Sequence, residues 1–182
     1  MTQLFTADHS LLLIIDVQGK LAQIMYERDK VYKNLTSFIK AAKILNIPII
    51  YTEQAPEKIG PTVSEIAQHL TNLTPIKKKS FSCCGSTEFL HELTKFNRQQ
   101  IIVAGIETHV CVYQTVIDLM ERKFKVQLVA DAVSSRTQEN KVIALERIKS
   151  AGIPLTSTEM IICELLKTAE HKNFKDIMGL IK

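Results

Sequence analysis

The sequence predicts an α/β fold, a three-layer α/β/α sandwich in which helices cover both faces of a central, mostly parallel sheet. Apolar segments of strand length alternate with segments whose apolar residues recur every three or four positions, as on one face of a helix. The connections are short and no internal repeat occurs. Such alternation is typical of parallel sheets. A chain of 182 residues is the size of one ordinary domain, so we expect a single domain over 1–182.

The first half of the chain begins with a strand that ends at Asp16. Leu11-Leu-Leu-Ile-Ile15 is continuously apolar, which indicates a strand buried on both faces. Apolar residues at helical spacing run from Val31 to Leu45, and Asn46 is placed to end this helix. The elements expected next are a strand at 47–51, a polar loop at 52–62, a short helix at 63–70, a short strand at 75–79, a loop at 80–86 and a helix through 89–93.

The second half contains the clearest central strand, Gln100-Ile-Ile-Val-Ala104, which leads through Gly105 into a long helix that carries Cys111. Thr156-Ser-Thr-Glu159 has the spacing of a capping box for a helix beginning at Met160. Asp131 is interpreted as a turn or cap residue rather than a catalyst. The other expected elements are a strand at 126–130 ending at Asp131, a helix at 138–150 that stops near Gly152, a short strand at 153–155 and a last helix that includes 174–178.

The composition is that of a globular protein, with 46% hydrophobic and 23% charged residues. The net charge of +4 comes from 23 Lys and Arg against 19 Asp and Glu, spread along the chain without a basic arm. This distribution argues against nucleic-acid binding. The start lacks the features of a secretory signal, and the longest apolar runs are too short to cross a bilayer. We therefore expect a cytoplasmic protein that does not enter the membrane.

The cysteines and histidines do not form a metal or redox motif. The spacing of the cysteines matches neither a zinc site nor a CxxC pair, which agrees with reduced thiols in the cytoplasm. Cys83-Cys84 is interpreted as a pair of loop or core thiols. The histidines show no HxH or HExxH spacing, and neither a GxGxxG nor a Walker sequence occurs. The sequence therefore predicts no metal and no cofactor.

Three residues that can carry chemistry fall where predicted strands end, and ligands bind at that edge of a parallel sheet. Asp16 ends the first strand, Lys78 lies where the third segment leaves the sheet, and Cys111 follows 100–104 at the next helix start. A thiolate is a nucleophile, and a helix N-terminus together with a nearby cation lowers the pKa of a thiol. The helix start also offers backbone N–H groups to an oxyanion. Asp16 can accept the thiol proton.

Each of these residues also has an ordinary structural interpretation. Cys111 can be a small core residue, because apolar residues flank it. Asp16 can be a turn former at a strand end. Lys78 stands between two other lysines, which by itself favours a solvated charged surface. His109 lies two residues before Cys111 and does not face it on a helix, so we do not expect a Cys–His pair.

Several segments together resemble the isochorismatase-like cysteine hydrolases. They occur in the order and at the spacing of that family between residues 10 and 160, and they are Leu13-Ile-Ile-Asp16-Val-Gln18, Lys78-Lys-Ser-Phe-Ser82, Ala104-Gly-Ile-Glu-Thr-His-Val-Cys111-Val and Val129-Ala-Asp131-Ala. The chain is most similar to the subgroup of isochorismatase-domain-containing proteins, through Thr52-Glu-Gln54, Gly60-Pro-Thr62 and Ala144-Leu-Glu-Arg147. The resemblance implies the isochorismatase-like hydrolase fold.

The resemblance also implies a catalytic triad in which Cys111 attacks a carbonyl, Asp16 is the base and Lys78 stabilises charge. Lys78 is chosen over its neighbours because the family lysine stands three residues before the aromatic residue of an aromatic–Ser pair, here Phe81-Ser82. The resemblance further implies a cis peptide bond before Glu107, so that the N–H groups of Glu107 and Cys111 form an oxyanion hole. By their positions, four residues are expected to line the substrate pocket: Gln18, Gln54, Phe81 and Tyr113.

We therefore expect a hydrolase that acts on a small amide or imide through a thioester. The loop at 52–62 lacks the metal-binding Asp-x-His of the nicotinamidases in this family, and members that hydrolyse isochorismate usually lack the cysteine. Two alternatives remain open, a catalytically idle binding or scaffold protein of the same fold and a thiol redox sensor that uses Cys111. The family resemblance also implies a homo-oligomer, either a dimer or a tetramer.

Overall fold

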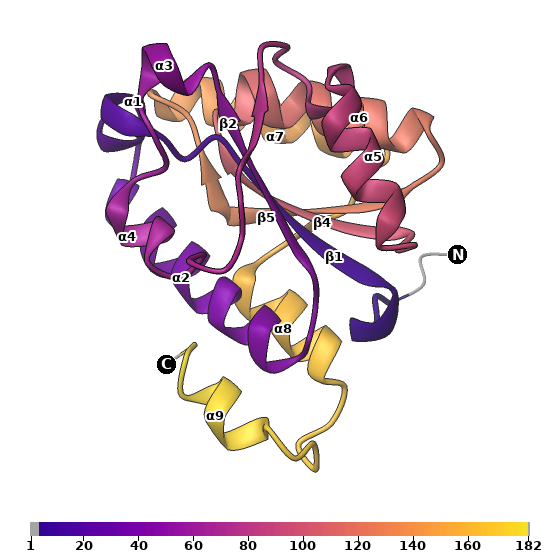
Figure 1. Cartoon of the computed structure of the whole chain (residues 1–182). Coiled ribbons are helices and arrows are strands. Elements are labelled where there is room, and N and C mark those ends of the chain that lie inside the picture. Colours follow the sequence, from indigo (N-terminus) through magenta and orange to yellow (C-terminus); the bar gives the residue numbers. More distant parts are fainter. Residues whose placement is uncertain (1–3, 182) are drawn as a thin grey trace.

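The computed structural model describes residues 4–181 and contains one six-stranded sheet. Its strand order is β3-β2-β1-β4-β5-β6, and every neighbouring pair in it is parallel (Figure 1). The strands are β1 (Ser10–Ile15), β2 (Ile49–Gln54), β3 (Ile76–Lys78), β4 (Gln100–Ile106), β5 (Lys125–Ser134) and β6 (Leu155–Thr156). Because all pairs are parallel, the carboxyl ends of the strands meet at one edge of the sheet.

The central strand β1 is buried over its whole length, because its side chains alternate between two hydrophobic cores. Leu12 and Ile14 belong to one core, whereas Leu11, Leu13 and Ile15 belong to the other. Successive side chains of a strand point to opposite faces of the sheet. A continuous apolar run is therefore what a strand between two helical layers requires, and the predicted central strand is confirmed.

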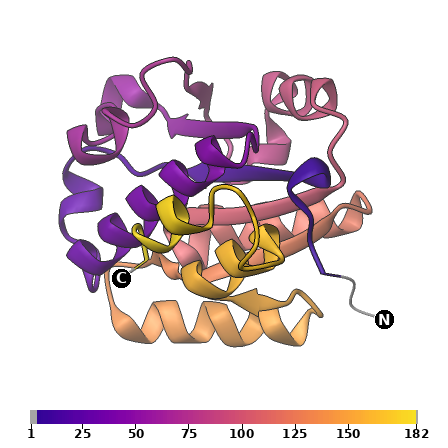
Figure 2. The ribbon, with the colours of Figure 1, turned by 90° about the horizontal axis from the view of Figure 1, so that it is seen from below.

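Helices cover both faces of the sheet and form the three layers that the sequence predicts. One core takes residues from α2 (Arg28–Ile44), α4 (Ser64–Ala67), α8 (Thr158–Leu166) and α9 (Phe174–Met178). Figure 2 is seen from the side of α8 and α9, which lie in front of the sheet. The other core takes residues from η2 (Cys83–Gly85), α5 (Thr87–Lys95), η3 (Thr108–Val112), α6 (Tyr113–Glu121) and α7 (Gln138–Ser150). The remaining short helices are η1 (Ala7–His9), α1 (Gly19–Gln23) and α3 (Pro56–Ile59).

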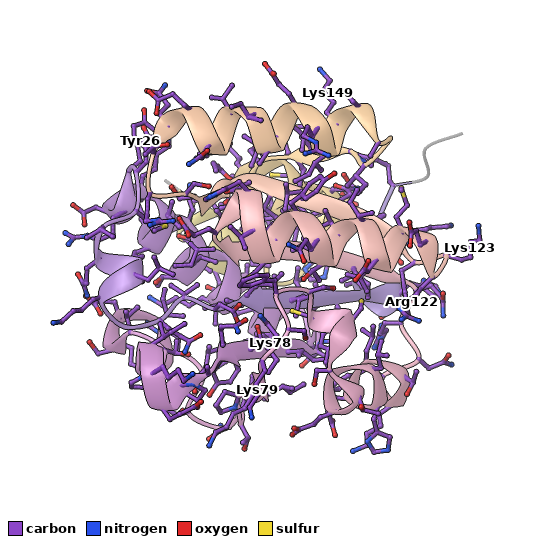
Figure 3. All side chains as sticks on the ribbon, turned by 90° about the horizontal axis from the view of Figure 1, so that it is seen from above. Tyr26, Lys78, Lys79, Arg122, Lys123 and Lys149 are labelled. Carbon is purple, nitrogen blue, oxygen red and sulfur yellow. The ribbon has the colours of Figure 1, made fainter. Side chains whose placement is uncertain are left out.

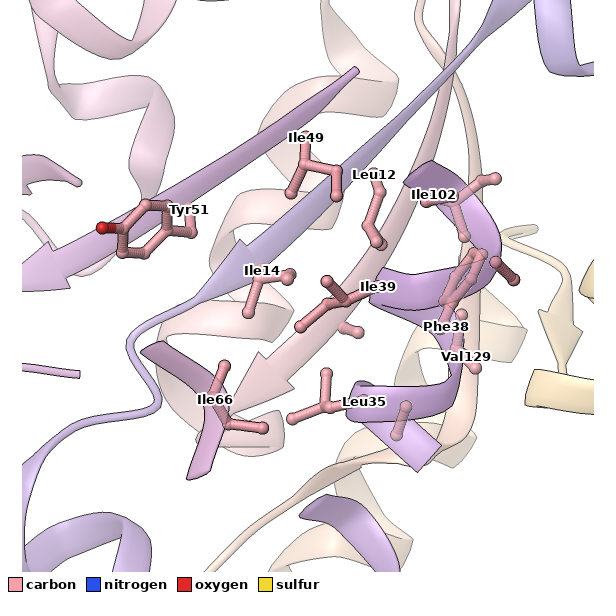
Figure 4. Packing of buried hydrophobic residues seen from close by; sticks show 14 of the residues in the cluster. Leu12, Ile14, Leu35, Phe38, Ile39, Ile49, Tyr51, Ile66, Ile102 and Val129 are labelled. Atoms are coloured by element: carbon pink, nitrogen blue, oxygen red, sulfur yellow. The ribbon is translucent and has the colours of Figure 1, made fainter. Parts of the chain in front are cut away.

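Helix α2 packs on the sheet through an apolar stripe. Its residues Leu35, Phe38 and Ile39 share one core with the side chains of β1 (Figure 4). These positions are spaced i, i+3 and i+4, so they lie on one face of a helix. The periodicity in the sequence therefore predicts this helix correctly. Within residues 4–181, none of the helices has the length and apolar character that crossing a membrane requires.

Several element boundaries differ from the predictions. β2 continues to Gln54, so the first part of the expected loop at 52–62 belongs to the sheet, and α3 occupies part of the rest. The sequence does not predict α1 or α3, because helices of five and four residues are too short to show an apolar period. β5 continues to Ser134, so Asp131 lies inside the strand and not at its end.

The starts of two helices also differ from expectation. The helix that carries Cys111 begins with a wider π-helical turn, η3, before α6 continues it. The N-cap of α8 is Ser157 and not Thr156, and the Ser157 Oγ accepts a hydrogen bond from the N–H of Met160 at 3.2 Å. Thr156 does not cap this helix because it is held in β6, which begins at Leu155 and not at residue 153.

Candidate active site

Asp16, Lys78 and Cys111 come together at the edge of the sheet where the strands end. Asp16 follows β1 directly, Lys78 is the last residue of β3, and Cys111 lies in η3 after β4. Because β2 lies between β1 and β3 and Lys78 is in register with Gln54, the side chain of Lys78 crosses β2 to meet Asp16. Asp16 and Cys111 line one cavity, and the charges of Asp16 and Lys78 both act on the Cys111 thiol.

Asp16 and Lys78 form a buried ion pair. Lys78 Nζ is 2.6 Å from Asp16 Oδ2, and the exposed fractions of the two side chains are 0% for Lys78 and 5% for Asp16. Lys78 Nζ also donates to Oε1 of Gln54 at 2.9 Å and to two backbone oxygens in the loop after β3. Asp16 Oδ1 accepts a hydrogen bond from Oγ1 of Thr52 at 2.7 Å. Both charged groups are therefore fully partnered, as buried charges need to be.

The geometry of a strand explains which lysine of the run is buried. Within β3, Ile76 and Lys78 are buried whereas Lys77 is exposed, because successive side chains point to opposite faces. Lys79 lies beyond the end of the strand and is exposed; Figure 3 labels Lys78 and Lys79. The interpretation of Lys78 as part of a solvated charged surface is therefore wrong.

The thiol of Cys111 is protonated at neutral pH. Burial raises its pKa to about 12, and the charge of Asp16 and a hydrogen bond with Asp16 contribute in the same direction, whereas Lys78 lowers it. The sequence predicts a lowered pKa, and this prediction is wrong for the present geometry. The ammonium of Lys78 is already paired with Asp16, and Cys111 is only 7% exposed. The thiol consequently needs a base to become a nucleophile.

The backbone before η3 contains the expected cis peptide bond, between Ile106 and Glu107. The carbonyl oxygen of Glu107 accepts hydrogen bonds from the N–H groups of Val110 at 3.0 Å and Val112 at 3.2 Å. Its carboxylate oxygen Oε2 accepts from the backbone N–H of Arg136 at 3.0 Å and from the Arg136 Nε at 3.1 Å. The carboxylate of Glu107 is thus paired with a cation outside the cavity.

A cavity of about 100 Å³ opens beside Cys111. Its polar lining residues are Asp16, Gln18, Gln54, Glu107 and Cys111, and its apolar lining residues are Leu21, Ile59, Phe81 and Val110. Of the four residues expected in the pocket, Gln18, Gln54 and Phe81 line this cavity and Tyr113 does not. The guanidinium of Arg147 lies 4.7 Å from the centroid of the Tyr113 ring, so Tyr113 belongs to the contact between α6 and α7.

The amides of Gln18 and Gln54 hold the walls of the cavity together. Gln18 Nε2 donates to the backbone oxygen of Gly60 at 2.7 Å, and Gln18 Oε1 accepts from the backbone N–H of Gln54 at 2.6 Å. Gln54 Nε2 donates to the backbone oxygen of Lys79 at 2.7 Å, while its Oε1 accepts from Lys78. Both side chains therefore position the cavity walls, and their polar atoms already have protein partners.

The sequence does not reveal three residues that complete the site, Thr52, Leu21 and Ile59. Thr52 falls in the expected loop but lies in β2, where it reaches Asp16. Leu21 and Ile59 belong to α1 and α3, which the sequence does not predict. The sequence holds one signal for this contact, the glycine at position 19: in the structure its φ is +49°, and a Cβ there would lie 2.0 Å from the carbonyl oxygen of Ile59. A glycine at that position allows the two helices to approach each other.

Other residues considered from the sequence have structural partners outside the cavity. His109 Nδ1 lies 2.9 Å from Oγ of Ser135. Asp131 Oδ1 accepts from the N–H and from Oγ1 of Thr158, each at 2.8 Å, so Asp131 binds the start of α8, whose N-cap is Ser157, and takes no part in the cavity. The Cys83-Cys84 thiols are buried. In the part of the chain that the structure describes, no group of three His, Cys, Asp or Glu side chains is arranged to hold a metal ion.

Replacing Lys78 by alanine is expected to lower the free energy of unfolding by about 3–5 kcal/mol, because Asp16 would remain buried without its counter-charge. Lys79→Ala is the matched control, since its side chain is exposed, and we expect a change within about 0.5 kcal/mol. Urea denaturation followed by circular dichroism measures both. A loss in Lys78→Ala no larger than in the control would contradict a buried charge pair.

Comparison with known proteins agrees with this architecture. Residues 10–160 match the isochorismatase domain. The chain is 40% identical over 174 residues to isochorismatase domain-containing protein 2 from Danio rerio, a match that covers 94% of this chain and 86% of the relative. It is 38% identical over 177 residues to the secreted isochorismatase effector Isc1 from Phytophthora sojae (strain P6497), which covers 95% of this chain and 84% of the relative.

A solved structure extends the similarity to the whole fold. The MAR1 ribonuclease from Caenorhabditis elegans superimposes with a TM-score of 0.92 at 37% identity, and the match covers 98% of this chain and 92% of that one. The domain match and the similarity of the relatives over nearly their full length point in the same direction. The chain therefore belongs to the isochorismatase family, a membership that supports a hydrolase.

Proposed function

We propose that this protein is a cysteine-dependent hydrolase that cleaves a small amide or imide through a thioester on Cys111. The observation that carries the proposal is that the Cys111 thiol and the Asp16 carboxylate line one cavity, with Lys78 buried against the carboxylate. A nucleophile, a base within its reach and a cation that orients the base are the components of nucleophilic catalysis. No metal or cofactor takes part in the proposed reaction.

In the first step Asp16 accepts the proton of the Cys111 thiol while the sulfur forms a bond to the carbonyl carbon. The raised pKa of the thiol requires this transfer, because little thiolate exists at neutral pH. The carbonyl π electrons move to oxygen, and the backbone N–H groups of Glu107 and Cys111 stabilise the resulting oxyanion. The ion pair with Lys78 keeps the Asp16 carboxylate oriented toward the sulfur.

In the second step the oxyanion re-forms the carbonyl and the carbon–nitrogen bond breaks. Asp16 returns its proton to the leaving nitrogen, so ammonia or an amine departs and a thioester remains on Cys111. Water then attacks the thioester and gives a proton to Asp16. Breakage of the carbon–sulfur bond releases the carboxylic acid, and the proton on Asp16 restores the thiol. Each step uses the same base, in alternating protonation states.

The alkylation of Cys111 by iodoacetamide is expected to accelerate about tenfold per pH unit from pH 7 to pH 10 without a plateau, because only the thiolate reacts. The thiol pKa of about 12 lies above that range. In Asp16→Asn the charge and hydrogen bond that raise this pKa are removed while Lys78 still lowers it. The pKa therefore falls, and Cys111 labels faster at pH 8 although hydrolysis is lost with the base.

Peptide mapping by mass spectrometry measures this labelling, and the exposed thiol of Cys163 serves as an internal reference in each sample. Slower labelling of Cys111 in Asp16→Asn than in the wild type at every pH would contradict the assigned electrostatics. If the rate of Cys111 labelling in the wild type reaches a plateau near pH 7, the thiolate is already formed at that pH. Asp16 is then not needed as the base for attack.

Two similar proteins, which are named as a ribonuclease and as a secreted isochorismatase effector, suggest two other substrates, RNA and isochorismate. RNA and isochorismate are both anionic, and none of the described residues that line the cavity is a lysine or an arginine. We therefore favour a neutral carbonyl substrate. A panel of amides and imides that also includes RNA and isochorismate compares these reactions directly in one preparation.

The other two hypotheses from the sequence make different predictions. A binding or scaffold protein would turn over no member of the panel. A redox sensor would form a peroxide-induced disulfide between Cys111 and another thiol. Burial also raises the pKa of Cys83 to about 12, so neither of these two buried thiols is in the reactive thiolate form at neutral pH. Because the raised pKa also applies to Cys111 as the hydrolytic nucleophile, the substrate panel and the peroxide test are what separate these hypotheses.

We also propose a homo-oligomer, either a dimer or a tetramer. Its support is a pair of adjacent apolar residues on α7, Val142 and Ile143, which are 44% and 55% exposed. We expect these two side chains to form part of the contact with the other chain. A cytoplasmic location stays a prediction.

A further inference from the structure

The polar atoms around the cavity leave little that could bind a charged ligand. The carboxylate of Asp16 is paired with Lys78, and that of Glu107 is paired with Arg136. The amide groups of Gln18 and Gln54 are bonded to protein partners. A substrate carboxylate in this cavity would lose its hydration without gaining a counter-charge, which is costly.

The remaining lining is apolar and the space is small. Leu21, Ile59, Phe81 and Val110 surround a volume of about 100 Å³. An apolar cavity of about 150 Å³ holds a benzene molecule of six carbons, so the present one holds about four non-hydrogen atoms. Burial of methyl and methylene groups against such walls is favourable, at roughly 0.8 kcal/mol for each CH₂.

Ile59 and Phe81 lie where this small cavity meets a second one, because both residues line both spaces. Both residues also line a second, outer cavity of about 430 Å³, together with Lys58 and Lys79. The two spaces share only Gln54, Ile59 and Phe81 among the described lining residues. The side chains of Ile59 and Phe81 therefore set the length of the group that fits beside Cys111.

We propose that the acyl part of the substrate is uncharged, apolar and about four non-hydrogen atoms in size, and that Ile59 and Phe81 set this limit. This inference rests on the proposed function, because it assigns the cavity beside Cys111 to the acyl group that becomes the thioester. It identifies the substrate class as amides of short aliphatic acids. It excludes amides that carry a carboxylate next to the scissile carbonyl.

Isobutyramide, oxamate and hexanamide test charge and length separately. Isobutyramide and oxamate have nearly the same shape, but the isopropyl group of the first is replaced by a carboxylate in the second. Hexanamide is neutral but too long for the cavity. We expect kcat/KM for isobutyramide, measured by ammonia release, to exceed that of either of the other two at least about tenfold. The same order is expected for protection of Cys111 against iodoacetamide.

The variant Ile59→Ala opens the small cavity toward the outer one. We expect hexanamide to gain about tenfold in kcat/KM in this variant, whereas oxamate does not improve, because no cation is added. Leu73→Ala is the control: it also shortens a partly exposed aliphatic side chain, but Leu73 lines neither of these two cavities. In this control, we expect kcat/KM for the three amides to keep the order found in the wild type.

The possible outcomes are distinct. The inference is overturned if the wild-type kcat/KM for oxamate or for hexanamide equals that for isobutyramide. It is also overturned if Ile59→Ala does not raise kcat/KM for hexanamide. If none of the three releases ammonia but the order of protection of Cys111 is the expected one, the inference stands and the proposed hydrolysis fails. If no compound protects Cys111, the assignment of the cavity to a neutral acyl group is overturned.

Discussion

Replacement of Cys111 by alanine is expected to remove hydrolysis of every substrate that the wild-type protein cleaves, by a factor of about 10⁴ or more. The sulfur forms the thioester, and no other described residue of the cavity lining is a Cys, Ser, Thr or Lys. Loss of the nucleophile of a serine protease costs a factor of about 10⁶ in kcat. Removal of one buried sulfur atom lowers the free energy of unfolding by only about 1 kcal/mol. Ammonia release, with circular dichroism of each variant, measures both effects.

Two further variants separate chemistry from packing. Cys163→Ala removes an exposed thiol on α8 and is expected to retain full activity. Cys111→Ser keeps nearly the same volume but replaces the thiol by a hydroxyl, which Asp16 deprotonates far less readily, so it is expected to be inactive. Full activity in Cys111→Ala would end the proposal of a thioester mechanism, whatever the other two variants show.

Gly105→Ala is expected to destabilise the fold by about 3–5 kcal/mol. Gly105 lies opposite Ile15 in the parallel pair of β1 and β4 and has a φ of +119°. A Cβ at this position would lie 2.2 Å from the backbone oxygen of Ile15 and 2.5 Å from its backbone nitrogen. These are main-chain atoms of the central strand, so they cannot rotate away as the end of a side chain can. Urea denaturation measures the loss.

Gly152→Ala provides the matched control for this effect. Gly152 also has a positive φ, of +89°, but a Cβ there would meet nothing within 4 Å. Only the backbone conformation is then strained, and we expect a loss of about 1 kcal/mol. Equal losses in the two variants would show that the contact with Ile15 does not matter. Because Asp16 follows Ile15, any Gly105→Ala protein that does fold is also expected to lose the geometry of the site.

The layers of the fold could be predicted because each long element has its own pattern. The apolar run at 11–15 and the stripe in α2 depend on contacts that repeat every two or every three to four residues. Short elements lack such repetition, so α1 and α3 are not apparent in the sequence. The extension of β2 to Gln54 is also not apparent, because its last three residues, Thr52, Glu53 and Gln54, are polar and interrupt the apolar run.

Some features of the site could also be predicted. Asp16 and Cys111 are placed by the ends of strands that the sequence indicates clearly, and the alternation of side chains in β3 allows only one lysine of its pair to face inward. The cis bond before Glu107 followed from the family resemblance. Thr52, which holds the second oxygen of Asp16, was not predicted, because its partner is 36 residues away.

The sequence by itself determined the layered fold, the strand ends that carry the reactive groups and the family to which the chain belongs. Only the tertiary structure decided the electrostatic state of the site. The pairing of Lys78 with Asp16, the protonated thiol of Cys111 and the lack of a free cation among the described lining residues follow from burial and from distances between separate strands. Burial and charge interactions depend on three-dimensional neighbours, and no spacing along the chain specifies them.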